Sequence, residues 1–403
     1  MNTARQVLLQ YITDNQNPYM EIARQIFANP ETSNHEYIAS KLLSDQLESH
    51  GFSVTRDVAG HPTGFTAVKK ATKKGPTIAF LAEYDALEGL GHGCGHNLIG
   101  TISTYASIAL SQQLDILGGE IRVYGTPGEE GGENGSAKED FVTKGYFDDV
   151  DIAMEIHPSS ENGVTPSSLA LDPVDIEFWG KAAHAGISPE LGINALDALI
   201  LTYNGINALR QHLTTDVKIH GIVMNGGSAP NIVPDYARGR FYIRAKTRPM
   251  VDKVFKKVEH IVQGAAIATG CTGKIARFQN KVDDIVKNEI LDDLYRETLT
   301  DMGLTWTENV VFSSTDAGNV SHVIPLLHPM LKTTSCGATL HSVEFRDSCI
   351  AADALSAIAT GAKLLALTAM KLLEQPALVD QIKLLHESLI SNAQNKSTKA
   401  LMS

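Results

Sequence analysis

The segment Thr77–Ala82, which reads TIAFLA, is almost entirely apolar. A strand of this kind is typical of the centre of a sheet with helices on both faces, because both of its sides are then buried. The runs Ile121–Gly125 and Asp151–Ile156 are further strand candidates, and Thr101–Leu114 has the pattern of a helix. This organisation predicts an α/β fold around a central sheet.

Chemically active side chains follow each of these three strands. They are Glu83 and Asp85 after the first, Glu129 and Glu130 after the second, and His157 after the third. In open α/β sheets, ligands and active sites lie at the carboxyl ends of the strands. We therefore expect these side chains to meet in one site.

The glycine-rich loop Gly91–Gly100 carries His92, Cys94 and His96. Imidazole and thiolate are usual ligands of zinc, and glycine lets the backbone bend closely around a small ion. By itself the loop is equally compatible with a turn whose polar side chains face water, because short His/Cys clusters also occur without a metal. The carboxylates and the imidazole at the strand ends favour the metal site.

Length and composition exclude several classes of protein. A chain of 403 residues is too long for one ordinary core and predicts two domains. A net charge of −12 offers no basic surface to a nucleic acid. The chain has no long apolar run, no signal-peptide core and only four, irregularly spaced cysteines. We therefore expect a cytoplasmic protein without a membrane or nucleic-acid partner.

The pattern changes near residue 173 into strand, helix, strand, strand, helix, strand, which is the ferredoxin-like order. These predicted elements are Val174–Gly180, Asn194–Leu213, Lys218–Met224, Arg238–Ala245, Val251–Thr269 and Gly273–Phe278. The α/β pattern then returns. We predict a catalytic domain formed by residues 1–172 and 282–403, with residues 173–281 inserted as a smaller domain.

The catalytic domain has further predicted elements on both sides of this insertion. They are helices over Thr3–Phe27 and His35–His50, strands over Phe52–Arg56 and Gly64–Lys69, a helix over Asn288–Met302, a strand over Leu326–Lys332 and a helix over Asp353–Leu373. The polar residues after Ser391 are expected to fray.

The motifs that carry the chemistry resemble those of the M20 family of metallopeptidases, and within it the amidohydrolase branch (M20D). They read AEYDAL (82–87), GHGCGHN (91–97), PGEEGGENG (127–135), EIHP (155–158), GKAAHAG around His184, APNIVPD (229–235), SSTDAGNVS (313–321) and TLHS (339–342). They occur in family order across nearly the whole chain. Asn97, where many relatives have aspartate, resembles the subgroup of aminobenzoyl-glutamate hydrolases and β-alanyl-dipeptide hydrolases.

The resemblance implies a zinc-peptidase-like catalytic domain, with a central mixed sheet flanked by helices, and an inserted dimerisation domain. It implies one or two divalent metal ions per subunit, zinc or manganese. The implied ligands are Cys94, His96, Glu130, His157 and His341. His92 is either a ligand or a loop histidine bonded to the backbone. Asp85 is expected to accept an N–H from a ligand imidazole and so to fix its tautomer.

Amide hydrolysis needs a polarised carbonyl, an activated water and a proton for the leaving amine. In an extended loop Glu129 and Glu130 point to opposite sides, so one can bind metal while the other faces the water. The family position assigns Glu129 as general base and acid, and Glu130 as a ligand. The more usual family pattern has His-x-Asp where this chain has Glu83-Tyr84-Asp85, so this chain lacks that histidine.

Three residues of the inserted domain are expected to contact substrate. In relatives, the histidine at the position of His184 reaches a neighbouring active site and helps to hold the substrate or the developing oxyanion. Asn231 belongs to the same set, and Arg244 can bind a substrate carboxylate as a bidentate fork. The alternatives are a turn histidine at His184 and an ordinary surface arginine at Arg244.

Two classes of function are compatible with these features. The first is a metal-dependent amidohydrolase or dipeptidase that acts on small N-acyl amino acids or dipeptides, as a homodimer or higher homo-oligomer. The second is a catalytically silent family member that serves binding or assembly. Silent members usually lose a base or a ligand, whereas this chain keeps the whole set. The sequence therefore favours the enzyme.

Overall fold

The computed structural model describes residues 3–308, 313–335 and 337–401. The chain forms two compact units. The larger one comprises Met1–Ser168 and Ile285–Lys396, and the smaller one includes Leu169–Asp284, the segment predicted as 173–281.

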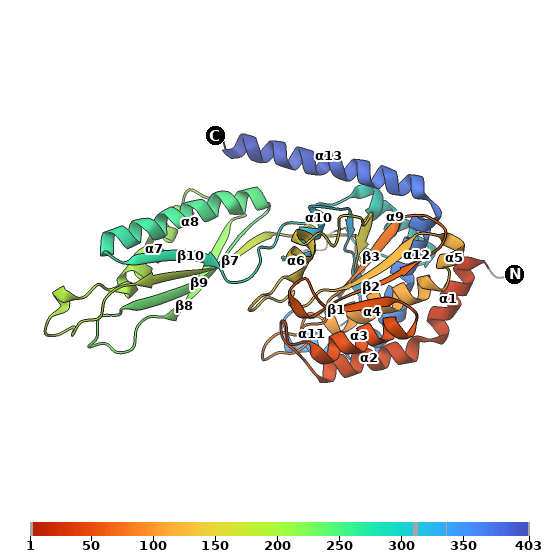
Figure 1. Ribbon diagram of the computed structural model, residues 1–403, viewed down its shortest axis with the longest axis horizontal. Coiled ribbons are helices and arrows are strands. Elements are labelled where there is room, and N and C mark those ends of the chain that lie inside the picture. Colours follow the sequence, from red (N-terminus) through yellow and green to blue (C-terminus); the bar gives the residue numbers. More distant parts are fainter. Residues whose placement is uncertain (1–2, 309–312, 336, 402–403) are drawn as a thin grey trace. The chain divides into compact units, whose positions relative to one another are not determined.

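The larger unit is built on a six-stranded mixed sheet (Figure 1). In spatial order its strands are β1 (Ser53–Val58), β2 (His61–Lys70), β4 (Glu120–Gly125), β3 (Thr77–Ala82), β5 (Ile152–Met154) and β11 (Leu326–Leu327). The pairs β1–β2 and β2–β4 are antiparallel, whereas β4, β3, β5 and β11 run parallel. The mixed sheet flanked by helices confirms the predicted fold class.

The apolar composition of strand β3 follows from its position, because its side chains enter two different hydrophobic cores. Ile78, Phe80 and Ala82 belong to one hydrophobic cluster, and Ala79 and Leu81 belong to another. Helices α4 (His96–Ser111) and α12 (Ala352–Glu374) contribute to the first cluster, and helices α6 (Ala137–Thr143) and α10 (Ala317–Ser321) contribute to the second. An apolar strand without alternation is therefore what a doubly covered sheet requires.

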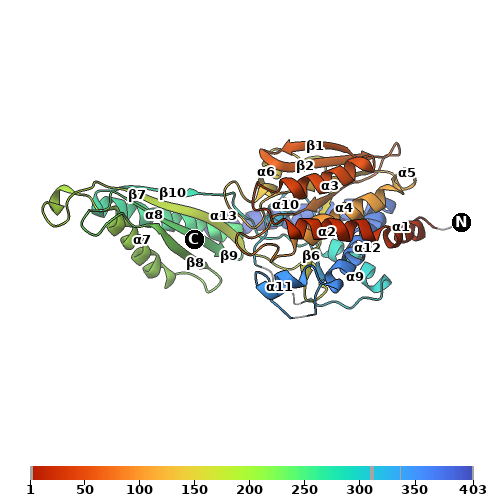
Figure 2. The same cartoon turned by 90° about the horizontal axis from the view of Figure 1, so that it is seen from below.

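The other helices of this unit pack around these layers, the last of them only through residues near its start such as Val379 and Ile382 (Figure 2). They are α1 (Ala4–Asp14), α2 (Gln16–Ala28), α3 (Tyr37–Ser49), α5 (Leu114–Leu117), α9 (Glu289–Asp301), α11 (Val343–Ser348) and α13 (Pro376–Leu401). Helix α12 is long and apolar enough to cross a membrane, but 78% of its most apolar window is buried inside the protein. This degree of burial is typical of a core helix.

Several predicted boundaries differ from the structure. Helix α4 begins at His96 instead of Thr101, because Gly95 takes a left-handed conformation (φ 81°) and lets the helix start directly after it. The strand predicted over 151–156 is short, and the chain continues in β6 (His157–Ser159), which pairs in parallel with β12 (Met330–Lys332). The strand predicted over 326–332 is divided into β11 and β12 around Pro329. The C-terminal segment continues as helix α13 to Leu401, where fraying was expected.

The smaller unit is a four-stranded antiparallel sheet with two helices on one face (Figure 1). In chain order its elements are β7 (Ala170–Trp179), a short 3₁₀ turn (Pro189–Leu191), α7 (Ala195–Arg210), β8 (Lys218–Asn225), β9 (Tyr236–Ala245), α8 (Arg248–Thr269) and β10 (Thr272–Arg277). The spatial order β10-β7-β9-β8 matches the predicted ferredoxin-like arrangement. Strand β9 alternates between buried and half-buried residues, because the helices cover only one face of this sheet.

Candidate metal centre

Three of the predicted ligands converge in the interior of the larger unit. The ligand atoms of Cys94, His96 and His157 all lie within 4.8 Å of one another, and the Cys94 Sγ is 3.5 Å from the His157 Nε2. All three side chains are buried. They come from the loop before α4, from the first residue of α4 and from β6, so the ends of a helix and a strand hold them in place.

Glu130 and His341 lie against this group. The Glu130 carboxylate is 3.8 Å from the His96 Nε2 through one oxygen and 3.3 Å from the His341 Nε2 through the other. The ligand atoms of Cys94, Glu130 and His341 again lie within 4.8 Å of one another. The backbone N–H of His341 donates to the Gly93 carbonyl at 2.9 Å, which ties this segment to the cysteine loop. The five predicted ligands therefore form one cluster.

Asp85 orients two of these residues. One of its oxygens accepts from the His96 Nδ1 at 2.9 Å, and the other accepts from the Glu130 backbone N–H at 2.9 Å. Burial lowers the pKa of His96, but Asp85 and Cys94 outweigh this effect and hold the pKa well above its usual range. Because Nδ1 is engaged by Asp85, Nε2 is the atom that His96 presents to the cluster.

Glu129 and Glu130 do not point to opposite sides as expected for an extended loop. The loop turns, with the Gly131 N–H donating to the Gly128 carbonyl at 3.2 Å, and both carboxylates approach His96. The Glu129 Oε2 is 3.9 Å from the His96 Nε2. Burial, together with the neighbouring Glu83 and Glu130, raises the pKa of Glu129 well above its usual value.

The cluster has the chemistry of a cation site. His96 Nε2, Glu83 Oε2 and Glu130 Oε1 are buried, and none of them has a hydrogen-bond partner within the described parts of the chain. Such atoms are costly to bury unless something satisfies them. Burial also raises the pKa of the Cys94 thiol well above its usual value, so its thiolate requires a cation beside it. The residues therefore fit a divalent metal ion.

A buried lysine beside this cluster was not predicted from the sequence. Lys138 is fully buried, and its Nζ donates to Glu83 Oε1 and to Asp316 Oδ1 at 2.5 Å each. Burial lowers its pKa, but Asp316 and Glu83 outweigh this effect and hold it well above its usual range. The segment AKEDFVT reads as an ordinary surface helix. Only Asp316, in the motif SSTDAGNVS, carried a signal of this network.

A second missed residue, Glu36, supports the loop that carries Glu129. Its carboxylate accepts from the Gly128 backbone N–H at 3.0 Å and from the Thr63 hydroxyl at 2.6 Å. Glu36 is fully buried, and burial, together with Asp85, raises its pKa to about 8. No motif in the sequence distinguished this residue.

His92 lies outside the ligand groups found among the described residues. Its ring is buried, and its Nε2 donates to the Ile26 carbonyl at 3.1 Å. Burial, with the neighbouring His96, lowers its pKa to about 3, so the ring is neutral near pH 7. These contacts are those of a loop histidine bonded to the backbone.

The predicted substrate residues of the smaller unit occupy two places. His184 and Asn231 are exposed and lie in neighbouring loops, because the Ala185 N–H donates to the Asn231 carbonyl at 3.0 Å. The His184 Nδ1 accepts from the Gly186 N–H at 3.2 Å. Arg244 is half-buried on β9, and its guanidinium lies 5.3 Å from the centre of the Tyr242 ring.

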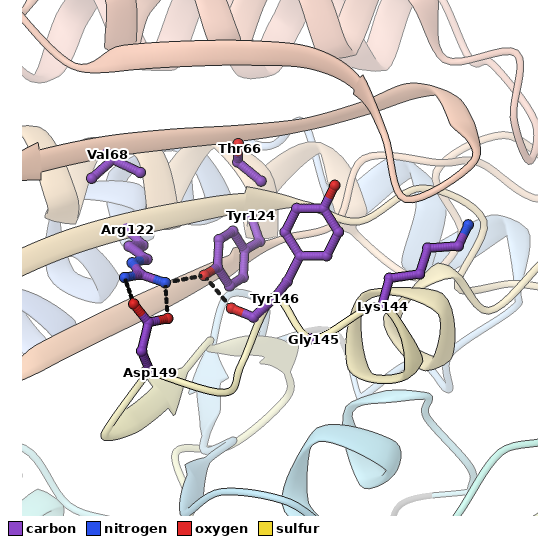
Figure 3. Close-up of a pocket in the computed structure, with 8 residues that line it drawn as sticks. All are labelled: Thr66, Val68, Arg122, Tyr124, Lys144, Gly145, Tyr146 and Asp149. Carbon is purple, nitrogen blue, oxygen red and sulfur yellow. Dashed lines mark hydrogen bonds and ion pairs between the residues drawn. The ribbon is translucent and has the colours of Figure 1, made fainter.

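One pocket of about 300 Å³ in the larger unit shares no residue with the cluster (Figure 3). Its arginine, Arg122, is bound to both oxygens of Asp149 at 2.6 Å, and the Tyr124 hydroxyl donates to the Tyr146 carbonyl. Arg122, Asp149 and Tyr124 are thus already paired within this pocket. The ligand cluster, and not this hollow, holds the unsatisfied chemistry.

Comparisons with known proteins identify similar chains. Residues 173–269 match the family described as the peptidase dimerisation domain. The chain is 33% identical to the Xaa-Arg dipeptidase of Mus musculus, over 92% of this chain and 91% of that protein. It is 39% identical to one subunit of the p-aminobenzoyl-glutamate hydrolase of Escherichia coli, over 71% of this chain and 62% of that protein.

Solved structures share the fold at lower identity. The aminobenzoyl-glutamate utilization protein of Klebsiella pneumoniae superposes with a TM-score of 0.74 at 20% identity, over 90% of this chain and 97% of that one. A dinuclear metal-binding peptidase of the M20 family from Bacillus subtilis gives 0.63 at 17% identity, over 90% and 99%.

The ligand cluster and these relatives define a metal-dependent hydrolase of amide bonds. Because the dipeptidase relative is matched over nearly its whole length, the chain belongs to the M20 peptidase family.

Proposed function

We propose that this protein hydrolyses the amide bond of small N-acyl amino acids or dipeptides, with Glu129 as general base and acid. We assign Cys94, His96, Glu130, His157 and His341 as the metal ligands. The observation that carries the proposal is the convergence of these side chains, most of them buried and some with unsatisfied ligand atoms, in one cluster.

The metal ion, the base and the supporting residues then have separate tasks. A bound divalent ion supplies polarisation of the scissile carbonyl and a water of lowered pKa. Glu129 would take a proton from the attacking water and give it to the leaving amine. Asp85 keeps the His96 Nε2 directed at the cluster and holds the Glu130 backbone in place. Glu36 and Thr63 restrain the loop before Glu129.

The substrate class is inferred from two relatives. One is named a dipeptidase and the other a hydrolase of p-aminobenzoyl-glutamate, in which an aromatic acyl group is joined to an amino acid. An amide next to a free carboxylate is the feature that such substrates share. We assign His184 to the developing oxyanion, and Asn231 and Arg244 to substrate binding.

We also propose that the smaller unit pairs two copies of the chain through strand β8. This strand lies at the edge of its sheet and exposes the apolar residues Ile222, Val223 and Met224. An exposed, apolar sheet edge is a liability unless a partner covers it, and two-fold pairing is the commonest solution. The mass of the Val223→Lys variant by light scattering should fall from dimer to monomer, whereas an unchanged dimer would place the interface elsewhere.

A metal-exchange assay tests the catalytic proposal. Exhaustive chelation, verified by elemental analysis, should abolish hydrolysis across a panel of dipeptides and N-acyl amino acids, and zinc or manganese should restore it. Full activity without metal would overturn the proposal. Metal binding without hydrolysis of any panel member would favour the alternative, a catalytically silent family member that serves binding or assembly.

Because Cys94 must stay reduced to bind metal as a thiolate, we assign the protein to a reducing compartment, the cytoplasm.

A further inference from the structure

Glu83 is a carboxylate beside the cluster that the ligand assignment leaves unused. It follows the central strand β3 and is fully buried. Its two oxygens have different surroundings. Oε1 accepts from the Lys138 Nζ at 2.5 Å, whereas Oε2 has no hydrogen-bond partner among the described residues.

The unsatisfied oxygen faces an equally unsatisfied nitrogen. Glu83 Oε2 is 3.5 Å from the His96 Nε2. This separation is longer than the ~2.7–3.2 Å of a normal N–H···O bond. It is close to the roughly 3.4 Å between two ligands of one tetrahedral zinc, given bonds of about 2.0–2.2 Å to nitrogen and oxygen. The pair therefore has the spacing of two ligands and lacks that of a direct hydrogen bond.

Lys138 explains why Glu83 holds this position. Its ammonium lies between Glu83 and Asp316, and its backbone N–H also donates to Asp316, at 3.1 Å. Lys138 is thus held both through its backbone N–H and through its side-chain ammonium. Because Glu83 Oε1 is bound to this fixed ammonium, Oε2 is the atom left to face His96.

We propose that Glu83 is a further metal ligand of this centre, that it binds through Oε2, and that Lys138 is the residue that positions it. The inference rests on the proposed function, since it needs a metal ion at His96. The Lys138 ammonium, which lies between Glu83 and Asp316, binds Oε1 of Glu83 and leaves Oε2 for the metal. Glu129 lies close by, with an oxygen within 4.8 Å of Glu83.

Metal affinity, and not activity alone, tests the assignment. In Glu83→Gln the charge and one carboxylate oxygen are lost, and in Glu83→Asp the charge is kept but the oxygen is withdrawn by one methylene. Affinity for zinc, measured by competition with a chromophoric chelator, should fall by at least 10-fold in both variants. The Co²⁺-substituted variants should also show a changed visible absorption spectrum, because the ligand field changes.

Two further variants separate ligation from general loss of structure. Lys138→Met removes the ammonium and keeps most of the volume, so zinc affinity should fall by roughly 10–100-fold, as for outer residues that orient a ligand. Asp292→Asn removes a buried carboxylate of the same unit outside the cluster and should leave both affinity and the Co²⁺ spectrum unchanged.

The outcomes distinguish this inference from the proposed function. If Glu83→Gln and Glu83→Asp bind zinc as tightly as the native protein, with an unchanged Co²⁺ spectrum, then Glu83 is only the ion-pair partner of Lys138 and the inference is wrong. If Cys94→Ser loses metal in the same experiment, the proposed centre still stands. A native protein that binds no divalent metal would overturn both. Should Glu83→Gln not fold, the Glu83→Asp variant decides alone.

Discussion

Two buried carboxylates, one in each unit of this protein, differ in how completely their oxygens are paired. In the smaller unit, Asp172 is fully buried and each of its oxygens is paired, with Arg248 at 2.9 Å and with Arg277 at 3.0 and 2.8 Å. In the larger unit, Glu83 and His96 are equally buried, and each leaves one atom unsatisfied. Complete pairing is what a structural ion pair needs. Incomplete pairing at several atoms that face one another indicates a ligand site.

The largest expected effect separates the two adjacent glutamates of the cluster. Glu129→Gln should keep the metal and lower kcat by roughly 10²–10⁴-fold, because the proton shuttle is lost. Glu130→Gln should lose metal, because it removes a ligand oxygen. Elemental analysis and kcat on the same samples give the answer. Equal behaviour of both variants, with metal retained, would show that the division of roles is wrong.

Asp172 tests whether a fully paired buried carboxylate serves stability alone. Asp172→Asn leaves buried arginine charge without its partner and should lower the free energy of unfolding by about 3–5 kcal/mol in urea titrations. Asp252→Asn is the matched control, because Asp252 pairs with the same Arg248 at 3.0 Å but has a half-exposed side chain. This substitution should cost under about 1 kcal/mol. Metal content of the folded protein should stay unchanged in both. A loss of metal in Asp172→Asn would contradict the separation of roles.

His184 tests whether the smaller unit also takes part in catalysis. His184→Ala should lower kcat by roughly 10²-fold, as for a lost oxyanion donor, with metal content unchanged. A mixed dimer of His184→Ala and Glu129→Gln chains is the sharper experiment. If His184 acts in the neighbouring subunit, one of the two sites regains both groups and activity partly returns. A verified mixed dimer without recovery would restrict His184 to its own subunit.

The smallest effect concerns an unsatisfied carboxylate of the larger unit that lies outside the cluster. Asp292 is buried, its Oδ2 has no hydrogen-bond partner among the described residues and only a distant ion-pair partner, the Lys287 Nζ at 3.8 Å, and burial raises its pKa to about 6. Because the pKa in the folded protein lies above the unfolded value, the ionised carboxylate destabilises the fold above about pH 6. This cost diminishes as the pH falls through that value and is gone below about pH 4.

Replacement of Asp292 shows whether an unsatisfied atom without function is simply a cost. Asp292→Asn should raise the free energy of unfolding at about pH 8 by about 1–3 kcal/mol, and the difference should vanish near about pH 4. Urea titrations at both pH values measure it. If Asp292→Asn is destabilised at the higher pH or has an altered metal content, then Asp292 contributes to stability or to metal binding and is more than a cost.

The main elements could be predicted because their signals are local. Strand β3 was predicted at its observed bounds, since six apolar residues in succession suit a strand with cores on both faces. The ferredoxin-like order was likewise readable from alternating periodicities. Boundaries that depend on a single backbone conformation were wrong. An example is helix α4, which begins directly after the left-handed Gly95. The expected fraying after Ser391 also differs from the structure, because helix α13 continues through this polar segment to Leu401.

The five ligand candidates could be named because the family resemblance implies them, whereas the residues alone pointed only to the His/Cys loop and to the side chains at the strand ends. The supporting residues could not be named. Glu36 contacts Gly128 across 92 positions of the chain, and its own neighbourhood carries no motif. The turn at Glu129 and Glu130 also escaped prediction, because the alternation expected of an extended loop does not hold once Gly128 and Gly131 form a hydrogen bond.

The sequence by itself predicted the layered α/β unit, the inserted ferredoxin-like unit and the candidate metal ligands. Periodicity reports which face of an element is buried, and side-chain chemistry reports which ions it can hold. The tertiary structure decided which charges are satisfied. Lys138 meets Glu83 and Asp316 across 55 and 178 positions of the chain, and only the packing of α6 against the ends of the strands brings them together. That choice of partner is a property of the folded core, because no local pattern records which distant side chain a buried charge will meet.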